Sequence, residues 1–343
     1  MHIQDPAIPF GSTIVVVGAN GYMALEVCDK VLMAGFRVRG TVRDVSKHSS
    51  RLHGILDPKY PGMFELVEVA NFEVEGASGV IFVSVPTIFN PDPSRVVDPL
   101  IRGLLNSLEA AKAAGVKRYV LNSSSKAVDS ADYSRPAREL TVDTFNHEAI
   151  EDMRNGDPTD VSFGRIVEVY SAARALHELA FWDWLKKNDE VPFVANCLVP
   201  DGQFGRVMDM YNVEHGVSSN GQLKNVMEGN WAAIGLQLAY FSDVQDSARL
   251  IVAALTLKSV GNERIFSYNV SRSWNGMRHK VRELFPDRPE LVQGEDQPVA
   301  GHDLATSPKP IARANQILQE IGQSGFVSED ATIRDFVTSM FPQ

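Results

Sequence analysis

Apolar segments and glycine-rich turns alternate along the chain and predict strands and helices in turn. Residues 13–17 are a continuous run of β-branched side chains, and a glycine turn and an amphipathic pattern over residues 25–34, closed by Gly35, come after it. Residues 36–42 then alternate with a period of two, as strands do. The beginning of the chain therefore predicts a strand, a helix and a second strand parallel to the first.

More apolar segments follow, with helical patterns between them. The further candidate strands are residues 64–69, 79–85, 118–122 and 193–199, and residues 98–114 have leucines at helical spacing. Such alternation indicates an α/β fold on an open, doubly wound parallel sheet, the Rossmann architecture. Because the pattern weakens after residue 200, we expect a Rossmann domain over residues 1–200. A smaller substrate lobe is expected over residues 201–343, with residues 236–270 returning to the sheet.

Composition excludes several functions. The 343 residues are 44% hydrophobic and 22% charged, as in ordinary globular proteins. A net charge of -10 argues against a nucleic-acid partner, which needs a concentrated basic surface. The first residues lack a basic and apolar leader, and the apolar runs are too short to span a bilayer, so we expect neither export nor membrane insertion. Two cysteines and scattered carboxylates favour a cytoplasmic protein without a metal.

The turn after the first strand has the spacing of a phosphate-binding loop. Gly18 permits a tight turn, Gly21 lets the backbone approach a pyrophosphate, and Ala24 allows close helix packing. Free amides at the start of the helix attract the negative charge. The alternative is a pair of loop glycines without a ligand. The residues expected to contact a dinucleotide here are Gly18, Asn20, Gly21, Tyr22 and Met23.

The end of the second strand indicates which dinucleotide is preferred. A site for NAD usually places Asp or Glu there, whereas this chain has Arg43, with Lys47 four residues later. A guanidinium can pair with the 2′-phosphate through two hydrogen bonds, and Lys47 adds a second positive charge. These residues favour NADP(H), unless Arg43 merely pairs with Asp44.

Several motifs in order carry a resemblance to a known family. They are Gly18-x-x-Gly21-x-x-Ala24 and residues 38–44, 116–124, 170–174, 198–200 and 241–246. On these motifs the chain resembles the extended short-chain dehydrogenases/reductases of the NAD-dependent epimerase/dehydratase family. Within that family it is most similar to the dihydroflavonol-reductase-like enzymes and the microbial carbonyl (aldehyde) reductases.

The resemblance implies a catalytic group. Ser124 matches the serine that orients a substrate carbonyl, and Tyr170 matches the tyrosine that transfers the proton. The family has Lys four residues after that tyrosine, on the same helical face, where it holds the nicotinamide ribose. This chain has Arg174 there, which keeps a positive charge and can bind ribose hydroxyls but cannot relay a proton. Lys126, two residues after Ser124, is a further candidate for the missing lysine, although a lysine at this position is usually solvated.

Three functions are compatible with this group. The first is an NADPH-dependent reductase of a ketone or aldehyde, with Ser124 and Tyr170 acting on the carbonyl. The second is an isomerase, cyclase or rearrangement enzyme of specialised metabolism that binds NADP without net hydride transfer, with Tyr170 and Arg174 as acid and cation. The third is a nucleotide sensor, which has no need of both Ser124 and Tyr170.

The resemblance also implies contacts elsewhere in the site. Asn71 stands where relatives bind adenine, Val85 ends the strand predicted over residues 79–85, and Pro200 faces the nicotinamide. Aromatic side chains at the usual positions of the substrate pocket suit a bulky, flat substrate, with core packing as an equal alternative. They are Phe89, Phe204, Tyr211 and Trp231. His177 is expected to pack in the helix two turns after Tyr170. Because relatives occur as monomers or homodimers, we expect one of these two states.

Overall fold

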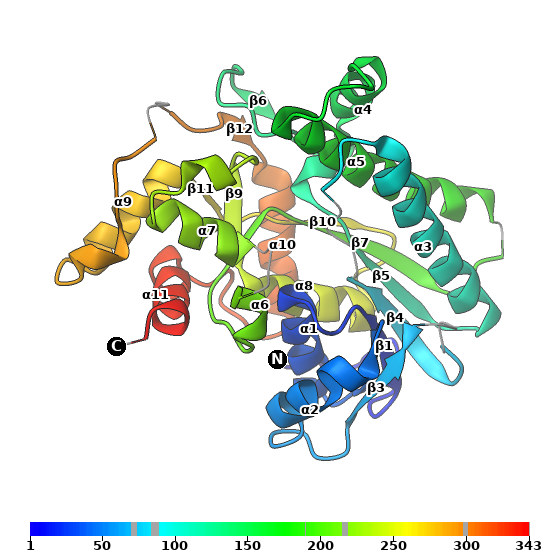
Figure 1. Cartoon of the computed structure of the whole chain (residues 1–343). Helices are drawn as coiled ribbons and strands as arrows, with labels where there is room; N and C mark the ends of the chain where they lie inside the picture. Colours follow the sequence, from blue (N-terminus) through cyan, green and yellow to red (C-terminus); the bar gives the residue numbers. More distant parts are fainter. Residues whose placement is uncertain (70–73, 84–88, 189, 215–218, 298–300, 343) are drawn as a thin grey trace.

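A seven-stranded sheet, in which all neighbouring strands pair in parallel, forms the centre of the larger part of the protein (Figure 1). The computed structural model describes residues 1–69, 74–83, 89–188, 190–214, 219–297 and 301–342. The strands, in sheet order, are β10 (Arg264–Ser267), β7 (Val194–Pro200), β5 (Arg118–Asn122), β4 (Ala77–Phe82), β1 (Thr13–Val17), β2 (Arg37–Val42) and β3 (Phe64–Glu68). The order runs outward in both directions from β1 and β4, which confirms the predicted doubly wound α/β fold.

Helices cover both faces of this sheet (Figure 1). One layer consists of α1 (Tyr22–Met33), α2 (Val45–Leu56), α8 (Val244–Thr256) and α10 (Pro308–Glu320), and the other of α3 (Pro93–Ala113) and α5 (Phe163–Lys187), with α4 (His147–Asn155) against α5. Side chains of β1 alternate between the two layers: Ile14 and Val16 face the first, and Val15 and Val17 face the second. The continuous apolar run in β1 is therefore explained by burial on both faces.

A smaller group of elements, which we term the small lobe, packs around its own apolar core. It consists of β8 (Gly202–Phe204), α6 (Tyr211–Glu214), α7 (Ser219–Met227), η3 (Trp231–Ala233), β9 (Tyr240–Asp243), β11 (Val270–Ser271), α9 (Trp274–Leu284), η4 (Pro289–Leu291) and α11 (Glu329–Met340). A three-stranded sheet of order β11-β9-β8 lies at its centre. The remaining short elements are η2 (Ser125–Ala127) and the paired strands β6 (Arg138–Glu139) and β12 (Ala305–Thr306).

The structure places some segments differently from the sequence pattern. The acidic region of residues 139–160, for which the sequence pattern predicted no element, contains helix α4. Helix α10 lies outside the segment expected to return to the sheet, yet Ala314, Ile317 and Leu318 are buried in the core that α1 and α8 share. Helical spacing of these apolar residues gives α10 one face to bury, and the sequence alone does not say against which core it packs.

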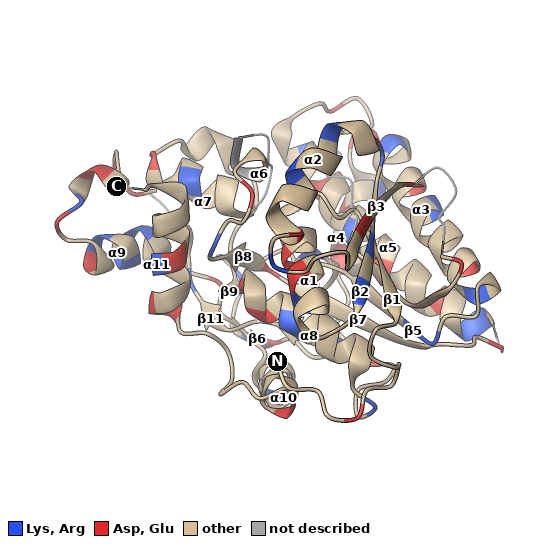
Figure 2. Cartoon of the chain, turned by 90° about the horizontal axis from the view of Figure 1, so that it is seen from below, with Lys and Arg blue, Asp and Glu red and all other residues tan. Residues whose placement is uncertain are grey.

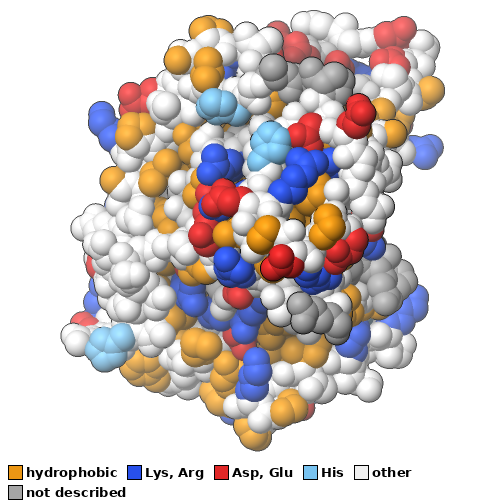
Figure 3. All heavy atoms as spheres, turned by 90° about the vertical axis from the view of Figure 1, so that its left-hand side faces the viewer, with side chains coloured by type: hydrophobic (Ala, Val, Ile, Leu, Met, Phe, Trp, Pro, Cys, Tyr) orange, Lys and Arg blue, Asp and Glu red, His pale blue; other side chains and the backbone are white. Residues whose placement is uncertain are grey.

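Charges of both signs are spread over the surface (Figure 2). On the face shown in Figure 3, Lys and Arg side chains lie next to Asp and Glu side chains, so this face does not offer the continuous basic surface that a phosphate backbone needs. Within the described parts of the chain, every helix is too short or too polar to cross a bilayer. The same residues contain no group of three or more His, Cys, Asp or Glu side chains arranged to hold a metal ion.

Candidate active site

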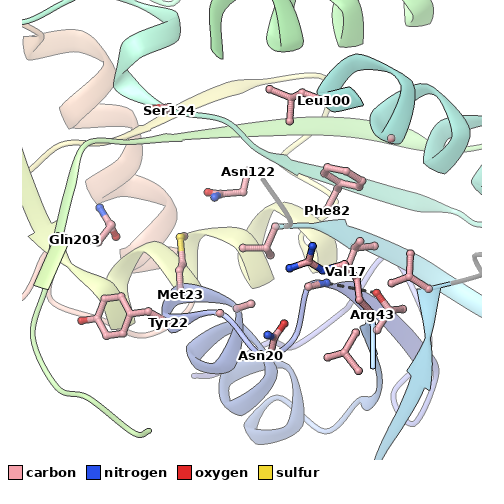
Figure 4. Close-up of a pocket in the computed structure, with 18 of the residues that line it drawn as sticks. Val17, Asn20, Tyr22, Met23, Arg43, Phe82, Leu100, Asn122, Ser124 and Gln203 are labelled. Carbon is pink, nitrogen blue, oxygen red and sulfur yellow. Dashed lines mark hydrogen bonds between the residues drawn. The ribbon is translucent and has the colours of Figure 1, made fainter. Parts of the chain in front are cut away.

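A cavity of about 1020 Å³ opens at the carboxyl ends of the strands (Figure 4). Its walls include the last residues of five strands: Val17, Val42, Phe82, Asn122 and Pro200. Open α/β sheets bind ligands at this edge, where the strand order reverses. The position of the cavity therefore follows from the topology of the sheet.

The glycine turn forms one wall of the cavity. Gly18 has a φ of +84°, a backbone conformation that side chains disfavour, and its N–H donates to the Thr41 carbonyl over 3.1 Å. Helix α1 begins without a side-chain cap and without an acidic residue in its first turn, so its first amides can bind an anion. Figure 4 shows Asn20, Tyr22 and Met23, three of the residues predicted to contact a dinucleotide, on this wall.

Cationic and imidazole side chains line the end of the cavity next to β2. Arg43 and Lys47, the residues predicted to recognise a 2′-phosphate, are both exposed there. Asp44 caps helix α2 and lies 3.5 Å from the Lys47 ammonium. His48 also lines this end and was missed by the sequence analysis. Burial, and then the positive charge of Arg51, hold the pKa of His48 below its ordinary value, which favours the neutral ring.

The three predicted catalytic residues line the opposite wall together. Ser124 follows β5 and its Oγ accepts a hydrogen bond from the Lys126 amide over 3.2 Å. Tyr170, on α5, packs against the ring of Phe89 with 5.5 Å between the ring centroids. Arg174, one turn further along α5, completes the group. The spacing of four residues thus brings the phenol and the guanidinium to the same cavity.

Arg174 is a buried cation with few partners. It is 3% exposed, and its Nη2 donates to the Asn122 carbonyl over a long 3.4 Å. Its Nε and Nη1 have no hydrogen-bond partner among the residues that the structure describes. Burial lowers the pKa of this guanidinium. The group still carries its positive charge, because arginine is hardly ever deprotonated in proteins. The charge of Arg174 is therefore left for a ligand in the cavity.

The nearest buried carboxylate is already neutralised by another arginine. Glu178 accepts from Arg264 Nε over 2.5 Å, from Ser123 Oγ over 2.6 Å and from Trp182 Nε1 over 3.2 Å. His177, between Arg174 and Glu178 in sequence, is fully buried as expected, and burial holds its pKa well below the ordinary value. A neutral His177 adds no charge, so Arg174 supplies the positive charge beside Tyr170.

Two predicted substrate residues need correction. Phe204 is 0% exposed and packs in the core of the small lobe with Phe241 and Trp274, away from the cavity. Trp231 lies against the same core, and its indole N–H donates to the Glu295 carbonyl over 3.1 Å. Core packing, which the sequence analysis gave as the alternative to a substrate pocket, explains both aromatic side chains. Asn71 and Val85 lie outside the described residues.

Other residues were missed or assigned to the wrong surroundings. Gln203, next to Phe204, lines the cavity, and its Oε1 has no partner among the described residues. Asp201 also lines it, held by Ser125 Oγ over 2.8 Å. Lys126 is neither solvated nor part of the cavity wall: it is 3% exposed and donates to the carbonyls of Ser130 and Gln237 over 3.2 and 3.1 Å. Strand alternation places Gln203 rather than Phe204 toward the cavity, which is the signal that could have found it.

A Rossmann sheet with a glycine turn and a serine, a tyrosine and a cation on the facing wall defines a nucleotide-dependent enzyme of the dehydrogenase type. No protein-family model matches the chain. It is 30% identical to aldehyde reductase 2 of Sporidiobolus salmonicolor over 98% of both chains. It is 28% identical to ketoreductase adrE of Penicillium rubens over 96% of this chain and 97% of the relative.

Solved structures agree on the fold. Gre2 of Candida albicans, in complex with NADPH, superposes with a TM-score of 0.76 at 20% identity, covering 96% of this chain and 98% of that one. The chain belongs to the extended short-chain dehydrogenase/reductase family, in the branch of the aldehyde reductases and ketoreductases.

Proposed function

We propose that the protein is an NADPH-dependent reductase of a ketone or aldehyde, acting on a bulky substrate of specialised metabolism. One observation carries the proposal: Ser124, Tyr170 and Arg174 share a cavity with the glycine turn and with Arg43. The relatives named as aldehyde reductase and ketoreductase support reduction over the isomerase alternative.

The residues present fit the cofactor. The uncapped start of α1 suits the pyrophosphate, and Arg43 and Lys47 suit the 2′-phosphate. The buried guanidinium of Arg174 suits the ribose hydroxyls, because its Nε and Nη1 have no partner among the described residues and such donors gain more from an acceptor than solvated ones do. When bound, NADPH supplies the hydride.

The side chains of this chain supply the rest of the reaction. Ser124 donates a hydrogen bond to the carbonyl oxygen and polarises the bond, and Tyr170 donates its hydroxyl proton to that oxygen as the carbon accepts the hydride. The carbonyl would leave as an alcohol, and the positive charge of Arg174 would stabilise the tyrosinate that remains. Arg174 cannot return the proton, so the proton of Tyr170 comes back from water in the cavity.

We further propose a cytoplasmic enzyme whose partner is its small-molecule substrate, either as a monomer or as a homodimer. Cys28 and Cys197 are both buried and unpaired thiols, which suits a reducing compartment.

The first experiment is a titration of the purified protein with NADPH and NADH, followed by nicotinamide fluorescence, and then a panel of aromatic ketones and aldehydes followed by loss of NADPH absorbance. We expect tighter binding of NADPH, consumption with at least one carbonyl, and loss of that turnover in Tyr170→Phe with NADPH binding retained. Arg43→Ala should bring the two affinities together. NADPH binding without consumption on any carbonyl would overturn the reductase in favour of the non-redox enzyme, and equal turnover by Tyr170→Phe would remove Tyr170 as the proton donor.

A further inference from the structure

Residues 205–211, which we term the strap, connect β8 of the small lobe with α6 and contact both helices that border the glycine turn. Figure 2 shows α6 beside α2. Near its beginning, Arg206 donates to both oxygens of Glu26 on α1 over 2.6 and 2.8 Å, and to Asp29 over 2.8 Å. The side chains of Glu26 and Asp29 are 1% exposed and that of Arg206 is 30% exposed, so the two carboxylates are shielded from water. The strap is thus fixed to the helix that starts at the phosphate-binding turn.

The other end of the strap is fixed to α2 by the opposite charge. Asp209 forms an ion pair with Arg51, and the Arg51 guanidinium lies 4.3 Å from the ring centroid of Tyr211. The side chains of Asp209 and Arg51 are 4% and 22% exposed, so salt screens the pair less than a surface pair. A cation holds the strap to α1 and an anion holds it to α2, which sets its direction over the two helices.

Arg51 continues this contact toward the cavity. Its Nη2 donates to His48 Nδ1 over 2.8 Å, so Nδ1 is the acceptor and the neutral ring carries its proton on Nε2. His48 Nε2 lies 3.4 Å from Nδ2 of Asn20, in the glycine turn, and because both nitrogens carry hydrogen this is a contact and not a hydrogen bond. Asn20, His48 and Tyr211 all line the cavity, at the end where Arg43 and Lys47 lie. The sequence predicted Tyr211 as a substrate contact, and in the structure its ring lies beside His48 and Arg51 of α2.

We propose that Arg51 and His48 are positioning residues for the cofactor, and that Asp209 of the strap holds Arg51 in place for this role. Arg51 fixes the orientation of the His48 ring beside the glycine turn, so the small lobe prepares the adenosine end of the cavity before the nucleotide arrives. The inference rests on the proposed function, because it assigns this end to an adenosine 2′-phosphate. Loss of the pair lowers the fraction of molecules with a prepared site, and the apparent affinity falls by the same factor.

The test uses Asp209→Asn, which removes the charge but keeps an oxygen for the Tyr211 amide, whose hydrogen bond to Asp209 Oδ1 is 3.1 Å long. A partly buried pair of this kind contributes about 1 kcal/mol, so we expect the Kd of NADPH to rise about fivefold. Adenosine 2′,5′-bisphosphate, measured by competition, should lose affinity by the same factor, with kcat at saturating NADPH unchanged. Met210→Ala, in the same strap and 46% exposed, is the matched control and should behave as the wild type.

Arg51→Lys separates charge from geometry. Its ammonium can still pair with Asp209, but a single point charge does not reach both Asp209 and His48 as the planar guanidinium does. We expect Arg51→Lys to weaken NADPH binding about as much as Asp209→Asn does. If the ion pair had only a structural role, a lysine that still pairs with Asp209 would not have to weaken binding. If Asp209→Asn binds both ligands with wild-type affinity, the proposed role of the strap is overturned and the proposed reductase is not. A loss of affinity for NADPH alone, without a loss for the bisphosphate, would overturn that role as well. Failure of the wild type to bind either ligand would overturn the proposed function as well.

Discussion

Replacing Arg174 by Met separates what its charge does in folding from what it does in binding. The side chain is 3% exposed, two of its nitrogens have no partner among the described residues, and the third donates over 3.4 Å. A buried donor without an acceptor costs about 1–3 kcal/mol. Because Met has a similar reach and no charge, we expect Arg174→Met to raise the free energy of unfolding of the cofactor-free protein by about 1–3 kcal/mol.

Binding should change in the opposite direction. A hydrogen bond from a charged donor contributes about 1.5–3 kcal/mol, so loss of one such bond to the ribose weakens NADPH roughly 10- to 150-fold. Arg174→Lys, which keeps a cation, is the control and should retain more of the affinity. Urea unfolding without nucleotide and NADPH titration give the two quantities. A variant that is less stable and binds NADPH as the wild type does would refute the assignment of this charge to the cofactor.

Two further predictions concern the glycine turn and a buried carboxyl group. A Cβ on Gly40 would lie 2.7 Å from the Cβ of Ala19 in the turn, so Gly40→Ala should lower stability by about 1–3 kcal/mol and weaken NADPH. Gly54→Ala, where a Cβ in helix α2 meets nothing within 4 Å, should instead stabilise the protein by up to about 1 kcal/mol in the same urea assay. Burial raises the pKa of Asp243 from 3.8 to about 6, so the folded state keeps a proton that the unfolded state releases, and stability falls as pH rises from about 4 to 6. Asp243→Asn still caps α8 and should add up to about 3 kcal/mol at pH 8 and little at pH 4, whereas Asp92→Asn, at the exposed cap of α3, should show no such gain with pH.

The sequence by itself determined the features that depend on neighbours along the chain. Strand β1, the glycine turn and α1 follow one another within 21 residues, so a short pattern fixed the phosphate-binding wall. Tyr170 and Arg174 lie one helical turn apart, so their position on the same face of a helix could be predicted from spacing alone. Arg43 directly follows β2, so its position at the carboxyl end of that strand could be predicted in the same way. The doubly wound sheet followed from the alternation of strands and helices.

Only the tertiary structure decided which side chains from distant segments meet. Phe204 and Gln203 are adjacent and both compatible with a pocket, and the packing of the small lobe turned the ring into the core and the amide toward the cavity. Lys126 was placed by the nearby Ser130 carbonyl and by the carbonyl of Gln237, which lies 111 residues further along the chain. The contact of Asp209 with Arg51 spans more than 150 residues, and no local periodicity encodes it. Such pairings depend on how whole elements dock, because each is made only after the sheet has brought both segments to the same edge.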